Sequence, residues 1–154
     1  MTAPTRVFGT LEEFRAARGQ LLGVGDWLEI TQQRIDAFAD VTGDTQWIHV
    51  DPVRAAAGPY GATIAHGYLT LSLIPLLGGR IFRVDGVRMA INYGTNKVRF
   101  PHPVTAGSRI RATAELARIE DTDAGVRAVI RYTLEIQGEA KPACVAETVR
   151  FLVP

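Results

Sequence analysis

The sequence is poor in cysteine, in long apolar runs and in charge of one sign, and each scarcity narrows what the protein can be. Its one cysteine, Cys144, cannot form an internal disulfide, which fits a reducing compartment, and we expect a cytoplasmic protein. Cys144 lies in an alternating apolar segment, so we expect a small packed side chain. No run approaches the ~20 apolar residues that span a bilayer. The N-terminus lacks the apolar centre of a signal peptide.

The formal net charge is +1, and Arg and Lys alternate with Asp and Glu without forming a basic block. Long-range attraction of nucleic acid is therefore not expected. The sequence also lacks a Gly-x-Gly-x-x-Gly or P-loop motif for a nucleotide, and a Gly-x-Ser-x-Gly elbow for a serine nucleophile. Its three histidines have no ligand-type spacing and there is no cysteine pair, so we expect no metal and no nucleotide cofactor.

What remains is the composition of an ordinary globular protein, with 47% hydrophobic and 21% charged residues among 154. This length suits one domain, residues 1–154, and no repeat, linker or low-complexity tract divides it.

The first part of the chain carries the signals of two helices. Thr10, followed three residues later by a glutamate, has the spacing of a capping box and predicts a short helix over about residues 10–19. Thr31 can cap a second helix with one apolar face, which should end near Gly43. A brief strand is expected at residues 27–30. The core of the domain is expected to begin with this strand and to extend to residue 154.

An irregular stretch follows, with a helical turn expected at residues 53–57. Residues 66–77 then form a helix that is apolar on nearly every side, so we expect protein to enclose most of its surface. Pro75 should distort this helix, and the glycines at 78 and 79 should end it.

From Val87 onward the period changes to two. Apolar and polar residues alternate over 110–116, 126–136 and 145–153, and turns are expected at 101–107 and 121–125. These signals predict an α+β fold in which a long antiparallel sheet of four long strands wraps around the central apolar helix. Such a sheet has an edge strand that needs cover, and edge-to-edge dimerisation is one way to supply it.

Asp44 and His49 are the leading candidates for chemistry. They lie five residues apart in the segment 43–49, GDTQWIH, in an expected loop after the second helix. Adding water to a double bond conjugated to a carbonyl needs a base for the water and an acid for the α carbon, and histidine exchanges protons near neutral pH. The spacing alone fits equally well a turn capped by Asp44 with His49 packed beside Trp47.

Ala65, His66 and Gly67 open the central helix. Unpaired N–H groups at a helix start suit an oxyanion, and Gly67 would let a substrate carbonyl approach the main chain. Gly67 could instead serve close packing. For His66 we favour a supporting role over solvent exposure.

Other charged or titratable residues have weaker signals. Arg80, Lys97 and Arg99 could contact the phosphates of a ligand, or be solvated charges of a strand or loop. His102, between two prolines, is expected to be a loop residue.

At these residues the chain resembles MaoC-like, (R)-specific enoyl-CoA hydratases of the hotdog-fold superfamily. Their signature Gly-Asp-x-Asn-Pro-hydrophobic-His reads GDTQWIH here, so acid and base match, while Gln46 and Trp47 replace Asn and Pro. The likeness includes IAHG at 64–67 and NYGTNKVRFPHPV at 92–104, and runs from about residue 27 to the C-terminus. The motif Gln-Trp-Ile-His is shared with nodulation-protein-N-like sequences.

The resemblance implies a single hotdog domain, a homodimer, and an acyl-CoA or acyl-carrier-protein thioester as substrate. A trans-2-enoyl-CoA would place its thioester carbonyl against the N–H of Gly67, beside Ala65 and His66. Asp44 and His49 would hold a water that adds to C3 and deliver a proton to C2. The product would be an (R)-3-hydroxyacyl-CoA, the dehydration would run in reverse, and no cofactor would be consumed.

Two other functions stay open at this point. Hotdog acyl-CoA thioesterases use a carboxylate on or beside the central helix, and residues 66–77 contain no Asp or Glu. A non-catalytic acyl-thioester binding or partner-docking module would keep the fold and tolerate the replacements at Gln46 and Trp47.

Overall fold

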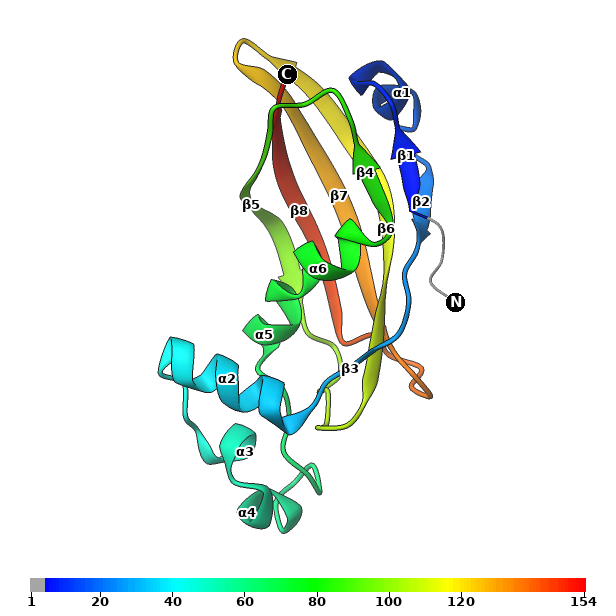
Figure 1. The fold of residues 1–154 in the computed structure, drawn as a ribbon. Helices are drawn as coiled ribbons and strands as arrows, with labels where there is room; N and C mark the ends of the chain where they lie inside the picture. The colour runs from blue at the N-terminus through cyan, green and yellow to red at the C-terminus, as the bar shows by residue number, and fades with distance from the viewer. Residues whose placement is uncertain (1–4) are drawn as a thin grey trace.

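The structure, a computed structural model, describes residues 5–154. A six-stranded antiparallel sheet curves around a helix built of two pieces, α5 (Gly67–Ser72) and α6 (Ile74–Gly79) (Figure 1). Along the sheet the strands are β2 (Leu21–Val24), β6 (Arg109–Thr122), β7 (Gly125–Ile136), β8 (Cys144–Val153) and β5 (Met89–Arg99), with the short β3 (Leu28–Glu29) also paired to β6. β1 (Arg6–Phe8) and β4 (Phe82–Val84) form a separate parallel pair.

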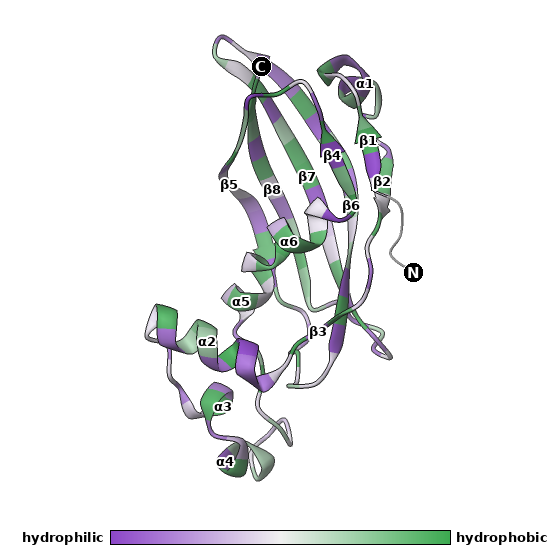
Figure 2. Cartoon of the chain, viewed as in Figure 1, coloured by the Kyte–Doolittle hydropathy of each residue, from purple (hydrophilic) through white to green (hydrophobic). Residues whose placement is uncertain are grey.

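The long strands follow the alternation in the sequence, which is visible as changing hydropathy along each strand (Figure 2). The inward residues of β6 pair with inward residues of β7, and all of them are buried: Ile110 with Ile136, Ala112 with Leu134, Ala114 with Tyr132, and Leu116 with Ile130. The β6–β7 turn falls at Thr122–Gly125, inside the predicted range. The predicted sheet around a central helix is confirmed.

The central helix is interrupted at Leu73, two residues before Pro75, as the proline predicted. Its inward residues are buried against the sheet, and Gly78 permits a close approach, because a Cβ there would lie 2.5 Å from the Tyr132 hydroxyl. The prediction that protein encloses most of the surface of this helix is wrong for the single chain, since Tyr68 is 71% exposed. One side of the helix is open.

The N-terminal part differs in its bounds from the prediction. α1 spans Leu11–Ala16 and ends earlier than expected, because Ala17 already serves as its C-cap. α2 (Gln32–Thr42) has the predicted limits, with Thr31 as N-cap and Gly43 in the left-handed conformation at its end. The expected strand at 27–30 is reduced to β3, and the short strands β1, β2 and β4 were not predicted. Buried residues before position 27, among them Phe8 and Phe14, belong to the same core cluster as the sheet.

β5 is one of the two edge strands of the sheet, and its one neighbour is β8. Its residues are largely exposed, including Met89, Ile91 and Tyr93. At one end of the sheet, α2, α3 (Trp47–Val50) and α4 (Pro52–Ala56) gather beside the start of α5 (Figure 1). In the described residues 5–154, no helix has the length and apolar character needed to cross a membrane.

Candidate active site

Three chain segments meet where α5 begins. Asp44 follows Gly43 at the end of α2, His49 lies on the short helix α3, and His66 is the N-cap of α5. The prediction that His49 lies in a loop is therefore wrong, because residues 47–50 complete one helical turn with an N–H to C=O bond from Asp51 to Trp47.

His49 is buried and its orientation is fixed by the main chain. Its Nδ1 lies 2.6 Å from the carbonyl oxygen of Ile64. A carbonyl oxygen can only accept, so Nδ1 carries the hydrogen and Nε2 holds the lone pair of the neutral ring. This arrangement leaves Nε2 as the group that can exchange a proton with a ligand.

His66 is held in the same way and supports both candidate residues. Its Nε2 donates to the main-chain oxygen of Asp44 at 2.9 Å. Its ring stacks on that of His49, with centroids 3.8 Å apart and planes inclined by 23°, and Phe38 packs against it at 5.0 Å. The supporting role of His66 stays a prediction, and these contacts show how its ring could fulfil it. Nδ1 of His66 is buried without a hydrogen-bond partner in residues 5–154, so it is an acceptor with unused capacity.

The carboxylate of Asp44 is exposed, and one ligand-type atom from each of Asp44, His49 and His66 lies within 4.8 Å of the other two. The spacing of the histidines indicated no metal site, and it also gave no sign of this cluster. However, the two rings are nearly parallel, so their in-plane lone pairs do not converge at the ~2.1 Å that zinc–nitrogen bonds need. The arrangement suits proton transfer better than holding an ion.

Gln32 and Thr63 complete the support of the site, and sequence reasoning missed both. The Gln32 side chain donates through Nε2 to the main-chain oxygen of His49 at 2.7 Å, and its Oε1 accepts from the hydroxyl of Thr63. Gln32 thereby ties α2 to α3. Nothing in the sequence distinguishes Gln32 from the neighbouring Gln33.

Comparison with known proteins assigns the chain to a family. Residues 13–138 match the family described as MaoC like domain. The chain belongs to the MaoC-like family. The family match and the similar dehydratases point to the same activity class, so the protein is an enzyme of the hydratase/dehydratase type with a hotdog fold.

The similar proteins span nearly the whole MaoC-like chain. The 3-hydroxyacyl-thioester dehydratase Z of Mycobacterium tuberculosis is 55% identical over 94% of this chain and 96% of its own, and nodulation protein N of Rhizobium meliloti is 42% identical over 89% and 87%. The solved (R)-hydratase from A. caviae involved in PHA biosynthesis has a TM-score of 0.72 at 25% identity, covering 89% of this chain and 96% of its own. A MaoC-like dehydratase from Rhodospirillum rubrum, with a TM-score of 0.66 at 22% identity over 90% and 94%, shows the fold.

The two replaced positions of the MaoC-like signature differ in what they contribute here. Gln46 is the N-cap of α3, but its side chain is exposed and makes no capping hydrogen bond. The ring of Trp47 lies under the guanidinium of Arg54 at 4.3 Å and against Gly58. Trp47 thus packs α3 onto α4, and His49 keeps its place in the turn.

Gly67 and Ala65 have packing roles in the MaoC-like site. A Cβ on Gly67 would lie 2.9 Å from the ring of Phe100, so the missing side chain makes room for that ring. The N–H of Ala65 donates to the Val104 carbonyl at 2.8 Å and is engaged there. No side chain caps the first turn of α5. Because the N–H groups at a helix start have no partner within the helix, this turn offers hydrogen-bond donors.

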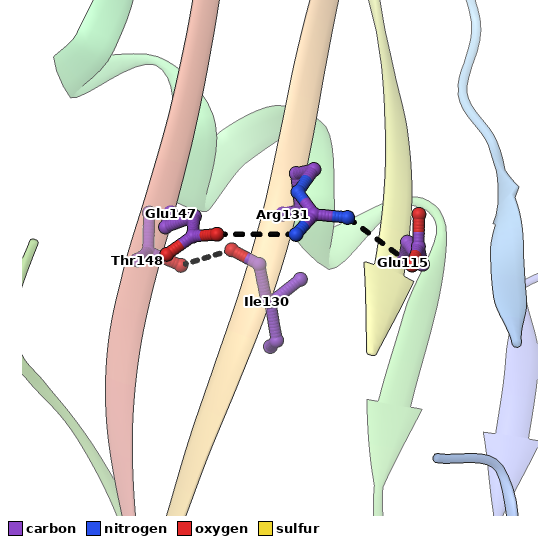
Figure 3. A network of polar contacts seen from close by, with 5 residues as sticks. All are labelled: Glu115, Ile130, Arg131, Glu147 and Thr148. Atoms are coloured by element: carbon purple, nitrogen blue, oxygen red, sulfur yellow. Dashed lines mark hydrogen bonds and ion pairs between the residues drawn. The ribbon is translucent and has the colours of Figure 1, made fainter. Parts of the chain in front are cut away.

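The cations proposed for phosphate contacts are not members of the cluster of Asp44, His49 and His66. Lys97 and Arg99 are on β5 and line a depression together with Arg131 and Glu147. Arg131 bonds both Glu115 and Glu147 across β6, β7 and β8 (Figure 3). The Arg131 hydrogen bond holds the pKa of Glu147 below its usual range.

Arg80 and His102 differ in their position relative to the site. Arg80 follows α6 as its exposed C-cap. His102 lies in the expected loop, pairs with Glu139 at 3.5 Å, and lines a recess together with Ala65 and Gly67 at the start of α5.

Proposed function

We propose that this enzyme catalyses the (R)-specific hydration of trans-2-enoyl-CoA to (R)-3-hydroxyacyl-CoA and the reverse dehydration. The observation that carries the proposal is the fixed ring of His49. Its Nδ1 bonds to the Ile64 carbonyl, which leaves Nε2 for proton exchange, and a ring nitrogen of His49 lies within 4.8 Å of a carboxylate oxygen of Asp44. The similar protein of M. tuberculosis is named a 3-hydroxyacyl-thioester dehydratase, and the similar protein of A. caviae is named an (R)-hydratase.

In the proposed mechanism, Asp44 and His49 hold one water between them. The water loses a proton to this pair as its oxygen bonds to C3, and the pair delivers a proton to C2. Main-chain N–H groups of the first turn of α5, at Gly67, would stabilise the negative charge on the thioester oxygen. Acid–base assistance of this kind is typically worth about 10²–10⁴-fold. The reaction consumes no cofactor.

We also propose a homodimer formed along β5. This edge is long, and it exposes Met89, Ile91 and Tyr93, which a second copy could cover by extending the sheet. The thioester carrier would be CoA or an acyl carrier protein.

The test is the loss of enoyl-thioester absorbance from crotonyl-CoA and a longer enoyl-CoA. Wild type should consume both, and Asp44→Asn and His49→Ala should each lower the rate by at least about 10²-fold while remaining folded. Tight binding of CoA esters with no turnover in wild type would instead support the binding module.

A further inference from the structure

The inner face of the sheet carries a charged residue, which does not fit an apolar core. Arg150 lies on β8 between the buried Ala146 and Leu152, and its side chain is half-buried. Its guanidinium lies 5.9 Å from the ring of Phe82. No carboxylate of residues 5–154 pairs with it, although seven ion pairs occur elsewhere in that range.

Arg150 opens onto a recess of about 230 Å³ between the central helix and strands β5 and β8. Leu71, Ile74 and Pro75 form its apolar side. The other side offers the polar groups of Asn92, Thr95, Tyr132, Thr148 and Arg150. The volume is below the ~300–1,000 Å³ of whole-ligand pockets, so the recess suits the end of a ligand.

Tyr132 adds a hydrogen-bond donor beside this cation. Burial raises the pKa of its hydroxyl to about 12, so the group stays protonated at neutral pH. A guanidinium and a phenol that share one recess are suited to a carboxylate, which accepts from both.

The chain's own elements do not supply that carboxylate. β5, α5 and α6, which surround the open side of the recess, contain no Asp or Glu. In a dimer paired along β5, the partner's copies of these elements would bring none either. Because a half-buried cation without a partner is unfavourable, the missing anion is best supplied by a ligand.

We propose that Arg150 and Tyr132 bind a carboxylate at the far end of the substrate's acyl chain, so that the preferred substrates are trans-2-enoyl thioesters of α,ω-dicarboxylic acids. This inference rests on the proposed function. The recess borders Ser72 and Pro75 of the helix that starts at Gly67. At 1.5 Å per helical residue these lie ~7.5–12 Å from Gly67, which about six to ten carbon–carbon bonds of an extended chain can span.

Binding tests the recess without requiring turnover. Calorimetry would compare suberyl-CoA, which ends in a carboxylate, with octanoyl-CoA of equal length. Wild type should bind suberyl-CoA more tightly, and the affinity ratio should fall about tenfold in Arg150→Gln and less in Arg150→Lys. Arg118→Gln, which removes one exposed charge from the outer part of β6, should keep the wild-type ratio.

Turnover of the matching trans-2-octenedioyl-CoA and trans-2-octenoyl-CoA separates the two proposals. Hydration of the octenoyl ester without preference for the diacid, together with equal binding, would overturn the recess and leave the proposed function standing. An Arg150-dependent binding preference without any hydration would uphold the recess and overturn the function. A weaker dimer in Arg150→Gln at an unchanged ratio would assign Arg150 to the subunit contact and contradict the inference.

Discussion

The sheet and the candidate active-site end of this molecule are held together by different interactions. In the sheet, apolar side chains pair across β6 and β7 and are removed from water. At the candidate active-site end, side chains reach distant main-chain carbonyls, as His49 does to Ile64 and His66 to Asp44. The first kind of interaction gives stability over many residues, whereas the second gives orientation at a few atoms. The two regions should therefore respond differently to substitution.

The largest effect on stability is expected in the sheet. Leu134→Ala removes a fully buried side chain opposite Ala112 and should cost about 2–5 kcal/mol of the free energy of unfolding. Thermal melting would register a fall of ~2–4 °C per kcal/mol for a chain of this size. The rate per folded molecule should change little. A large loss of kcat with normal melting would break the separation between the two regions.

His66→Phe should reverse that pattern. Phenylalanine keeps the apolar ring beside Phe38 but removes the donor to the Asp44 carbonyl and the polar stacking partner of His49. We expect kcat/KM to fall by about 10–100-fold, with a smaller change in melting temperature than in Leu134→Ala. His66→Gln, which retains a side-chain N–H, should recover part of the loss. Equal activity in His66→Phe would show that the ring only fills space.

Gln32→Leu tests the support that α2 gives to His49. The change removes the donor to the His49 carbonyl and the acceptor for Thr63, so kcat/KM should fall by about tenfold. Gln33→Leu is the matched control, because its side chain is exposed on the same helix. Similar kinetics in the two variants would show that Gln32 does not support His49.

The smallest effect concerns the ion network of the sheet. The pKa of Glu147 is lowered by its hydrogen bond to Arg131, so the unfolded chain binds more protons at this site than the folded one. The stabilisation is therefore present above the unfolded pKa and is lost as the pH falls through the folded pKa. Melting curves of wild type and Glu147→Gln should differ at neutral pH and converge in acid. A difference that grows in acid would contradict the assignment.

The sheet could be predicted from the sequence because its determinants are local and repeated. Alternation over 110–116 and 126–136 sets strand faces, and Thr31 and Gly43 mark the ends of α2 by their capping chemistry. β1 and β4 were missed because each has three residues and they pair across more than 70 positions.

Predictions of the site were limited for a related reason. Asp44 and His49 form a recognisable pair, but every residue has a main-chain carbonyl, so no sequence signal marks Ile64 as the acceptor for His49. The cluster with His66 also depends on contacts between segments 15 or more residues apart.

The most direct measurement is the pH dependence of kcat/KM for enoyl-CoA hydration in wild type and His49→Ala. The account predicts a sigmoidal or bell-shaped profile in wild type, because Nε2 of His49 must exchange a proton in each turnover. It also predicts that His49→Ala removes this dependence along with most of the activity. An unchanged profile in His49→Ala would contradict the assignment of His49 as the proton-transfer group.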